Sequence, residues 1–409
     1  MYKNIQLMKI IQVNCVYRKG STGKIVYDIH TELQHRGFDS IVCYGRGEKV
    51  DEPNVYKTCS ELYSKLNNLW SRVTGIMYGG LSCSTRKLIK VIEREKPDIV
   101  HLHCINGYFV NIYKIVEYLK KKHIKTVLSL HAEFMHTANC GHALECERWK
   151  TGCGHCSRYK QETKSFFIDG THRSWQLMKD AFEGFGSNII VTSVSAWLMN
   201  RAKQSPIMSD LEHCVVFNGL NTEIFRYRKF EDEYEKSKEG YKGIIFHATP
   251  FLSSDPNHIK GGYYVVELAK IMSDYHFFIA GNYDKRMDIP SNVTLLGILV
   301  NQETLAKFYS ISDITILTSK KETFSMVTAE SLCCGTPIVG FKAGAPETIS
   351  IPEYSRWVDY EDIMSLRNAV LEVLKLDINK EELSKLSMLL YDRKVMVENY
   401  INVYNRLLK

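Results

Sequence analysis

The chain has 409 residues, of which 44% are hydrophobic and 24% charged, a composition that excludes wholesale disorder and suits two domains. Nine prolines and 25 glycines exclude a fibrous chain, and no apolar run reaches the roughly 18 residues of a membrane-spanning helix. Lys and Arg exceed Asp and Glu by seven, and residues 61–130 alone hold twelve basic and five acidic residues.

The concentration of positive charge in residues 61–130 indicates either an anionic partner or a solvated helix face. The anionic partner can be a membrane, nucleic acid or a substrate. Nucleic acid is not expected, because no recognition module accompanies the charge. Residues 1–8 lead into the first expected strand without the apolar core of a signal peptide, which predicts a cytoplasmic protein.

Short apolar strands alternate with helical segments along the chain. The first half is expected to form strands at residues 10–13, 40–44, 98–103, 126–130 and 189–192, with a turn at 18–23 followed by a helix from 24 to about 34. The charged stretch 226–242 is expected to be a linker. Strands then resume at residues 243–247, 275–280, 314–317 and 337–340. This alternation predicts two doubly wound α/β domains with parallel sheets, with ligands bound in a cleft at the carboxyl ends of the strands.

Two loops that follow expected strands carry motifs. Gly20-Ser21-Thr22-Gly23 follows the first strand, where glycine allows close approach of a ligand and the helix N-terminus offers N–H groups to a phosphate. The spacing matches neither a dinucleotide fingerprint nor a Walker motif, and a plain tight turn remains an alternative.

The second motif places two glutamates after the strand at 314–317. Glu322 and Glu330 are separated by seven residues, which leaves them about 80° apart on a single helix. They can meet one ligand if Glu322 lies in a loop and Glu330 on the following helix, with Ser325 as its N-cap. Two solvated surface glutamates are the alternative.

The residues from Val293 to Glu347 resemble the donor half of family 4 glycosyltransferases of the GT-B fold. The matching features are Gly297 at a strand end, residues 309–313, the E-x7-E pair of Glu322 and Glu330, Cys334-Gly335-Thr336-Pro337, and Gly344 with Glu347. Residues 20–23, His131 and Asn218-Gly219 also fall where the family has them, so the resemblance covers nearly the whole chain. The resemblance is closest to bacterial members of the family that assemble colanic acid, exopolysaccharide or O-antigen.

The resemblance implies a hexosyl- or glycosyltransferase that retains the anomeric configuration of a UDP- or GDP-sugar. Glu322 and His131 would be the catalytic residues, with Glu322 on the donor sugar and His131 near sugar and acceptor; a purely structural role is the alternative for His131. The donor-binding residues implied are Gly23, Lys260, Thr323, Phe324, Ser325 and Glu330. Among these, Lys260 would neutralise the diphosphate, residues 323–325 would offer backbone amides to it, and Glu330 would hold the ribose.

The resemblance implies no side-chain nucleophile and no catalytic metal ion, and the sequence has no Asp-x-Asp motif. One departure concerns the diphosphate. Many relatives have an arginine about six residues before the lysine, but residues 249–255 contain no basic residue. Thr249, Ser253 and His258 are the candidates to replace its contacts.

Four cysteines within seventeen residues form a separate cluster: Cys140, Cys146, Cys153 and Cys156. Four thiolates suit a structural zinc ion, whereas a cytosolic disulfide is disfavoured. Free thiols are the alternative, because the first two spacings are longer than those of common zinc sites.

The expected organisation is an N-terminal acceptor-side domain over 1–230 with a cysteine-rich insertion at about 134–165, and a donor domain over 240–409. The resemblance allows the last helix to return to the N-terminal domain. The expected function is transfer of a sugar to a cell-surface glycan or lipid-linked acceptor, with peripheral contact to the inner face of the plasma membrane. The alternatives are a sugar-nucleotide epimerase of the same fold and a non-catalytic, zinc-containing adaptor with a degenerate donor site.

Overall fold

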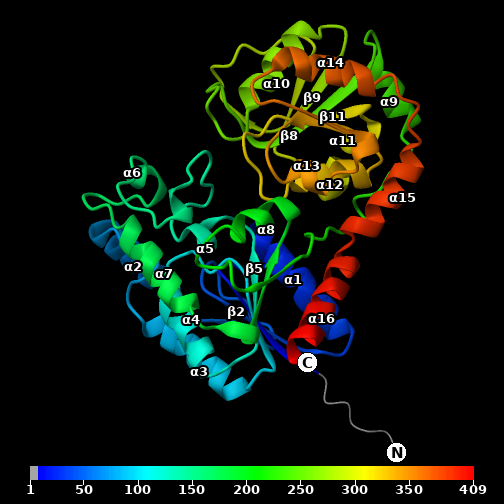
Figure 1. Ribbon diagram of the computed structural model, residues 1–409. Helices are drawn as coiled ribbons and strands as arrows, with labels where there is room; N and C mark the ends of the chain where they lie inside the picture. Colours follow the sequence, from blue (N-terminus) through cyan, green and yellow to red (C-terminus); the bar gives the residue numbers. More distant parts are fainter. Residues whose placement is uncertain (1–7) are drawn as a thin grey trace, which may run out of the picture. The chain divides into compact units, whose positions relative to one another are not determined.

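The computed structural model describes residues 8–409 and contains two compact units (Figure 1). The first unit comprises residues up to Val216 together with Met396–Lys409, and the second comprises Phe217–Val395. Residues 217–230 therefore lie in the second unit, although the sequence placed them in the first domain. The prediction that the N-terminal residues lack the apolar core of a signal peptide concerns residues 1–7, which lie outside the described residues. Within residues 8–409, no helix combines the length and apolar character needed to cross a bilayer.

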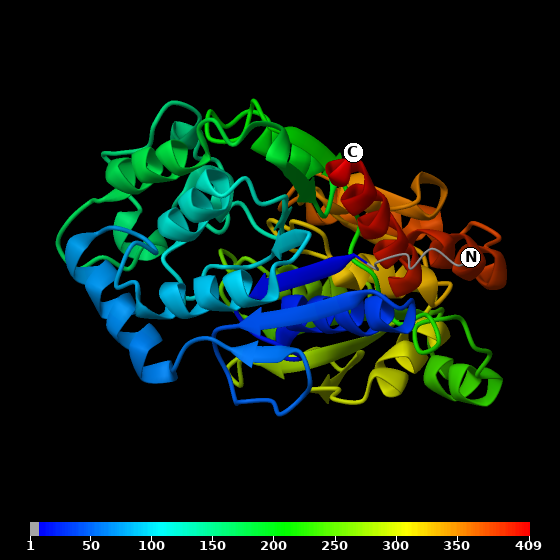
Figure 2. The same cartoon turned by 90° about the horizontal axis from the view of Figure 1, so that it is seen from below.

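The first unit is built on a seven-stranded parallel sheet of order β3-β2-β1-β4-β5-β6-β7. Its strands are β1 (Lys9–Asn14), β2 (Asp39–Tyr44), β3 (Val55–Lys57), β4 (Ile99–Leu102), β5 (Thr126–Leu130), β6 (Ile189–Ser193) and β7 (Glu212–Val215). Every residue of β4, β5 and β6 is buried, as expected for a parallel sheet that is covered on both faces. The blue strands β1 and β2 lie side by side in Figure 2. In their register, Ile11 is opposite Ile41.

The helices of the first unit connect these strands. They are α1 (Gly20–His35), α2 (Glu61–Thr74), α3 (Cys83–Glu95), α4 (Ile112–Lys121), α5 (Phe134–Thr137), α6 (Tyr159–Glu162), α7 (Thr171–Phe182) and α8 (Ala196–Ala202). The last helix, α16 (Arg393–Leu408), packs Val397, Tyr400 and Tyr404 into the same core as Ile10 and Ile29. The C-terminal segment of the chain therefore belongs to the first unit.

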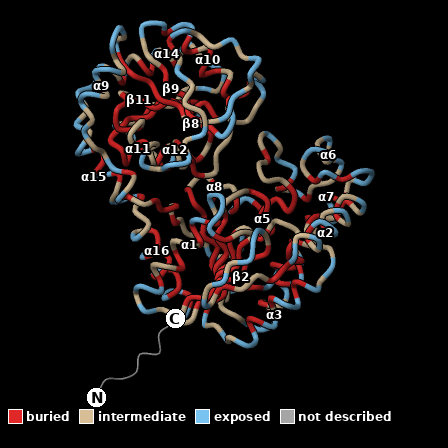
Figure 3. Tube along the Cα trace, turned by 180° about the vertical axis from the view of Figure 1, so that it is seen from behind, coloured by how far each residue is buried: buried red, intermediate tan, exposed pale blue. Residues whose placement is uncertain are grey.

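The second unit has a six-stranded parallel sheet of order β10-β9-β8-β11-β12-β13. Its strands are β8 (Ile244–Leu252), β9 (His276–Tyr283), β10 (Val293–Gly297), β11 (Ile314–Leu317), β12 (Ile338–Phe341) and β13 (Ser355–Val358). Its helices are α9 (Glu231–Lys238), α10 (Gly262–Ile271), α11 (Gln302–Ile311), α12 (Met326–Cys333), α13 (Pro346–Ile349), α14 (Ile363–Val373) and α15 (Lys380–Tyr391). Both sheets have the 3-2-1-4-5-6 core order of a Rossmann-like fold. The predicted α/β class with two doubly wound domains is confirmed, and Figure 3 colours the strands of each sheet mainly as buried.

Two local predictions are wrong. Residues 20–23 form the first turn of α1 instead of a turn before it, with Gly20 at a φ of 67°. The expected linker at 226–242 contains α9, which is held by side-chain contacts within the second unit. Tyr234 donates a hydrogen bond to Asp313, and Lys307 pairs with Glu233 at 2.7 Å. These contacts stabilise a helix that has no apolar stripe of its own.

Candidate active site

Lys260 and Glu322, which are far apart in the sequence, meet in the second unit. Lys260 Nζ donates a hydrogen bond to Glu322 Oε1 at 2.7 Å, and the two side chains are 32% and 15% exposed. A ligand can therefore reach both of them. The loop of Lys260 lies directly against the segment that follows β11, because a Cβ on Gly261 would lie 1.9 Å from the carbonyl oxygen of Thr318. The positive φ of 62° at Gly261 also favours glycine.

The loop of Glu322 is fixed by the turn after β12. The Glu322 N–H donates to Ala343 O at 2.9 Å, and the Ala345 N–H donates to Glu322 O at 3.2 Å. The Glu347 carboxylate accepts a hydrogen bond from the Gly344 N–H at 2.8 Å. Glu347 therefore stabilises the turn that holds Glu322.

Ser325 is the N-cap of α12, as predicted. Its hydroxyl accepts a hydrogen bond from the Thr328 N–H at 3.2 Å. Its φ of 83° is strained for a residue with a side chain, and such strain is concentrated at functional sites. The Phe324 ring beside it is buried near Phe217 and Tyr391. Only the backbone of Phe324 is thus left to meet a ligand.

A cavity of about 460 Å³ lies at the carboxyl ends of β8 and β9. Its lining is mostly apolar and consists of Ala248, Thr249, Pro250, Ala280, Gly281, Ile298, Leu299, Leu305, Met326, Val327 and Glu330. The Tyr309 hydroxyl donates to Glu330 Oε2 at 3.1 Å and orients this carboxylate. An apolar wall with one oriented carboxylate suits a ligand that has a flat ring and neighbouring hydroxyl groups.

The loop between β8 and α10 contains one Lys or Arg, Lys260. The three candidates for replacing an arginine make local contacts at the end of β8 and in this loop. Thr249 Oγ1 donates to Phe251 O, Ser253 Oγ accepts from the Asp255 N–H, and His258 Nδ1 accepts from the Lys260 N–H. These contacts shape the segment that leads to Lys260.

His131 lies at the end of β5 in the first unit, beside His103 at the end of β4. Their rings stack with centroids 5.6 Å apart, and His103 Nδ1 lies 3.4 Å from His131 Nε2. Burial lowers the pKa of His131 to about 4 and lowers the pKa of His103 as well. Both imidazoles are therefore neutral near pH 7.

A buried polar network that the sequence did not reveal stands behind these rings. The His101 ring lies against that of His103 with centroids 3.8 Å apart and planes tilted by 33°, and His101 Nδ1 lies 2.7 Å from the Tyr404 hydroxyl. His101 Nε2 lies 2.7 Å from Ser129 Oγ, which lies 2.9 Å from the Tyr400 hydroxyl. The sequence feature that could have indicated this network is the pair His101 and His103 at the end of β4. This strand lies next to β5, which His131 follows.

Gly23 lies within the first turn of α1. A Cβ at this position would lie 3.2 Å from the Val16 side chain and 3.3 Å from the Arg18 nitrogen. The Gly23 carbonyl also accepts a hydrogen bond from the Arg18 N–H at 3.0 Å. The small size of Gly23 thus serves local packing, and its donor-binding role stays a prediction.

The cysteine-rich segment is tied to the first unit by Glu133. This buried carboxylate accepts hydrogen bonds from Arg201 Nε at 2.5 Å and from the Ala143 N–H at 2.8 Å. The four predicted zinc ligands, Cys140, Cys146, Cys153 and Cys156, are half-buried free thiols. Burial above all, with smaller contributions from Cys146 and Cys156, raises the pKa of Cys153 to about 12. Over residues 8–409, no group of three or more His, Cys, Asp or Glu side chains is placed so that it could hold a metal ion.

Comparison with solved structures places the chain among GT-B proteins. Sucrose-phosphate synthase from Thermosynechococcus elongatus matches with a TM-score of 0.67 and 13% identity, over 98% of this chain and 99% of that one. Alr3699/HepE of Anabaena, solved in complex with UDP, matches with a TM-score of 0.65 and 13% identity, over 97% of this chain and all of the other. These likenesses establish the fold.

Residues 253–376 match the family model of glycosyl transferases group 1. N-acetyl-alpha-D-glucosaminyl L-malate synthase of Bacillus anthracis is 22% identical over 384 residues, which cover 89% of this chain and 87% of the relative. The chain thus has the GT-B fold, and its residues 253–376 are similar to the group 1 glycosyl transferases.

Proposed function

We propose that the chain transfers a sugar, with retained anomeric configuration, from a nucleotide-sugar donor to a cell-surface glycan or a lipid-linked acceptor. The observation that carries this proposal is the Lys260–Glu322 pair next to the N-terminus of α12, with Glu330 in the adjoining cavity. A cation, a carboxylate and helix-end amides in one unit match the charge pattern of a nucleotide sugar.

The reaction breaks the bond between the anomeric carbon and a phosphate oxygen and forms a bond from that carbon to the acceptor oxygen. The acceptor's proton passes to the departing phosphate oxygen. Negative charge grows on the diphosphate as the bond breaks, and Lys260 together with the backbone amides of Thr323, Phe324 and Ser325 stabilises it. Glu322 holds hydroxyl groups of the donor sugar, and Gly23 allows a close approach of the first unit's backbone.

The cavity beside Glu330 takes the nucleoside. The Glu330 carboxylate accepts hydrogen bonds from the two ribose hydroxyls. Leu299, Leu305 and Val327 provide an apolar surface for the base. The complex of the similar Anabaena structure with UDP supports a nucleoside diphosphate here. The neutral His131 acts as a hydrogen-bonding partner for the sugar and the acceptor.

Two assays test the proposal. Thermal-shift screening against UDP- and GDP-sugars is expected to find a stabilising donor, because a bound ligand stabilises the folded state by mass action. Octyl glycosides then serve as acceptors, and free nucleotide is expected only when an acceptor is present. Isomerised donor without acceptor indicates an epimerase, and no donor binding at all indicates an adaptor; either result contradicts the proposed transfer.

We further propose that Cys140, Cys146, Cys153 and Cys156 hold a structural zinc ion. The donor chemistry fits, because four thiolates suit tetrahedral zinc and the thiols influence one another's pKa. The side-chain positions do not gather three donors, so zinc binding requires these thiols to rotate and lose their protons. About one zinc per chain is expected in the wild-type protein and in Cys83→Ser, and none in Cys153→Ser/Cys156→Ser. A zinc-free wild-type protein would contradict this.

We propose a cytoplasmic location, with the reaction at the inner face of the plasma membrane. The basic segment 61–130 supports this placement, because acceptors anchored in anionic bilayers attract cationic surfaces. No nucleic-acid partner is proposed.

A further inference from the structure

Helix α2 is folded with its apolar side outward. Its buried residues are Ser64, Asn67 and Ser71. Asn67 Nδ2 donates to Tyr108 O at 3.0 Å, and Ser71 Oγ donates to Ile76 O at 2.7 Å. The inward side of the helix is thus polar and hydrogen-bonded.

The opposite side of α2 carries an exposed row of large apolar residues: Leu62, Leu66, Leu69 and Val73. At 100° per residue, these four side chains fall within a stripe about 60° wide. Leu62 is 69% exposed. Such spacing normally marks the side of a helix that is buried. In the described part of the first unit, residues 8–216 and 396–409, no element covers this row, which forms a contiguous apolar surface.

The exposed loop at residues 166–168 extends this surface at the C-terminal end of α2. Phe166, Phe167 and Ile168 are all exposed, and Phe167 is 81% exposed. The Phe166 N–H donates to Arg72 O at 2.8 Å, which joins the loop to the helix. We call Leu62, Leu66, Leu69, Val73 and residues 166–168 the apolar ridge. Contiguous exposed apolar surfaces of this kind mark interaction sites.

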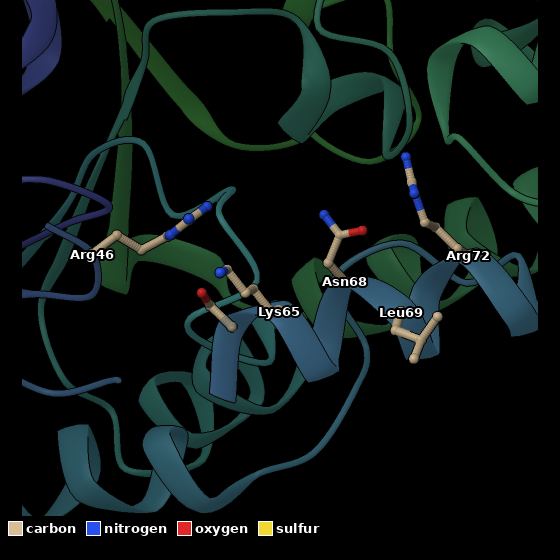
Figure 4. A pocket seen from close by; sticks show the side chains of 6 residues that line it. Arg46, Lys65, Asn68, Leu69 and Arg72 are labelled. Atoms are coloured by element: carbon tan, nitrogen blue, oxygen red, sulfur yellow. The ribbon is translucent and has the colours of Figure 1, made fainter. Parts of the chain in front are cut away.

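Cationic side chains flank the ridge. A hollow of about 220 Å³ is lined by Arg46, Ser64, Lys65, Asn68, Leu69 and Arg72. Figure 4 shows Asn68 and Arg72 projecting to the same side of α2, with Arg46 reaching toward Lys65. Arg46 also pairs with Glu61 at 2.9 Å. Residues 62–74 contain no Asp or Glu, and Lys164 lies next to the exposed loop.

We propose that the apolar ridge docks on an anionic lipid bilayer, with its leucines and phenylalanines at the acyl boundary and Lys65, Arg72 and Arg46 against lipid phosphates. An interfacial helix has this combination of an apolar stripe and flanking cations. Charge complementarity favours lipid over a second copy, because a second ridge would bring like charges together. This inference rests on the proposed function, since it places the first unit where a lipid-linked acceptor would be.

Vesicle sedimentation of the full chain tests the surface. Wild-type protein is expected to sediment with phosphatidylcholine–phosphatidylglycerol vesicles at about 0.1 M salt, and less at about 1 M, where the Debye length falls to about 3 Å. Leu66→Ser/Leu69→Ser should lower the partition coefficient about tenfold or more. Lys65→Gln/Arg72→Gln should lower it about fivefold per charge. Leu389→Ser, which changes a leucine that is 71% exposed in the second unit, is the matched control and should bind normally.

Three outcomes would overturn the inference: no sedimentation at low salt, equal binding by Leu66→Ser/Leu69→Ser and wild type, or a wild-type dimer in light scattering that these substitutions dissociate. Donor-induced thermal shifts are measured on the same samples. A variant of the apolar ridge that keeps its donor-induced thermal shift but no longer binds vesicles supports the membrane-docking role of the ridge, independently of catalysis. If the wild-type protein shows no donor-induced thermal shift, the proposed function is contradicted instead.

Discussion

The sheets of the two units share a strand order, but the side chains near the ends of their central strands differ in charge. The second unit presents the charged pair Lys260–Glu322, which is partly exposed. The first unit presents the stacked rings of His103 and His131, which burial keeps neutral. One topology thus supports a charged site in one unit and an uncharged one in the other.

This difference indicates a division of work. A charged pair held by fixed loops can meet charge that develops during bond cleavage, since preorganised groups need no reorganisation at that moment. Neutral imidazoles can position hydroxyl groups without attracting the diphosphate.

The largest effect is expected from Glu322→Gln. The substitution keeps the shape of the side chain but removes the charge that pairs with Lys260, so kcat should fall about 10²–10³-fold, or about 3–4 kcal/mol. Steady-state kinetics measure it, with Glu381→Gln, a change of an exposed side chain of α15, as control. An unchanged kcat would remove Glu322 from the catalytic residues.

Acid should destabilise the first unit before the second. Burial lowers the pKa of His30 and His131 to about 4, and also lowers those of His101 and His103; in the second unit it lowers that of His247 to about 4. In the unfolded chain these histidines take up protons near pH 6.5, whereas in the folded chain their imidazoles stay neutral to a lower pH. The free energy of unfolding should therefore fall between pH 6.5 and 4, by about 1.4 kcal/mol per pH unit for each histidine.

Hydrogen exchange at pH 7 and pH 5 measures this difference by segment. Strands β4 and β5 should lose protection before β8 and β11. The variant His30→Gln should show a weaker pH dependence of unfolding by urea, because it removes one of the buried imidazoles whose pKa is lowered. Earlier loss of protection in the second unit would contradict the comparison.

Glu330→Gln should weaken donor binding with little effect on the chemical step. The amide accepts hydrogen bonds less strongly than a carboxylate, so KM for the donor should rise about tenfold, or about 1.4 kcal/mol, with kcat nearly unchanged. Kinetics at saturating acceptor separate the two constants. A drop in kcat at constant KM would move Glu330 from binding to catalysis.

The smallest effect is expected at Ser325. Ser325→Ala removes the cap of α12 and keeps the strained φ, so unfolding by urea should show a loss of about 1 kcal/mol. Ser325→Gly loses the cap but relieves the backbone, and a loss of only a few tenths is expected. Equal losses in both variants would show that the φ of 83° carries no strain.

Strands were predictable where apolar residues form short uninterrupted runs. The bounds of β5 and β11 coincide with the expected residues 126–130 and 314–317, because full burial in a parallel sheet demands such runs. Helix α9 could not be predicted, since distant Asp313 and Lys307 stabilise it. Strands β3 and β7 were not predicted, because most of their residues are only partly buried and their sequences lack an uninterrupted apolar run.

The site was predictable where residue types are specific to its chemistry. The capping role of Ser325 followed from its position before α12. The family resemblance assigned Lys260 and Glu322 to one donor, and the structure brings them within 2.7 Å of each other. The network of His101, Tyr400 and Tyr404 did not follow from the sequence, because it joins residues about 300 positions apart. Nor does the leucine spacing of α2 predict an exposed row, since burial depends on which side the rest of the unit covers.

The most direct test of the central claim is a crystal structure with a bound nucleotide sugar. The ribose is expected within hydrogen-bonding distance of Glu330, the diphosphate at Lys260, and the sugar at Glu322. A nucleotide sugar bound away from these three side chains would contradict the account.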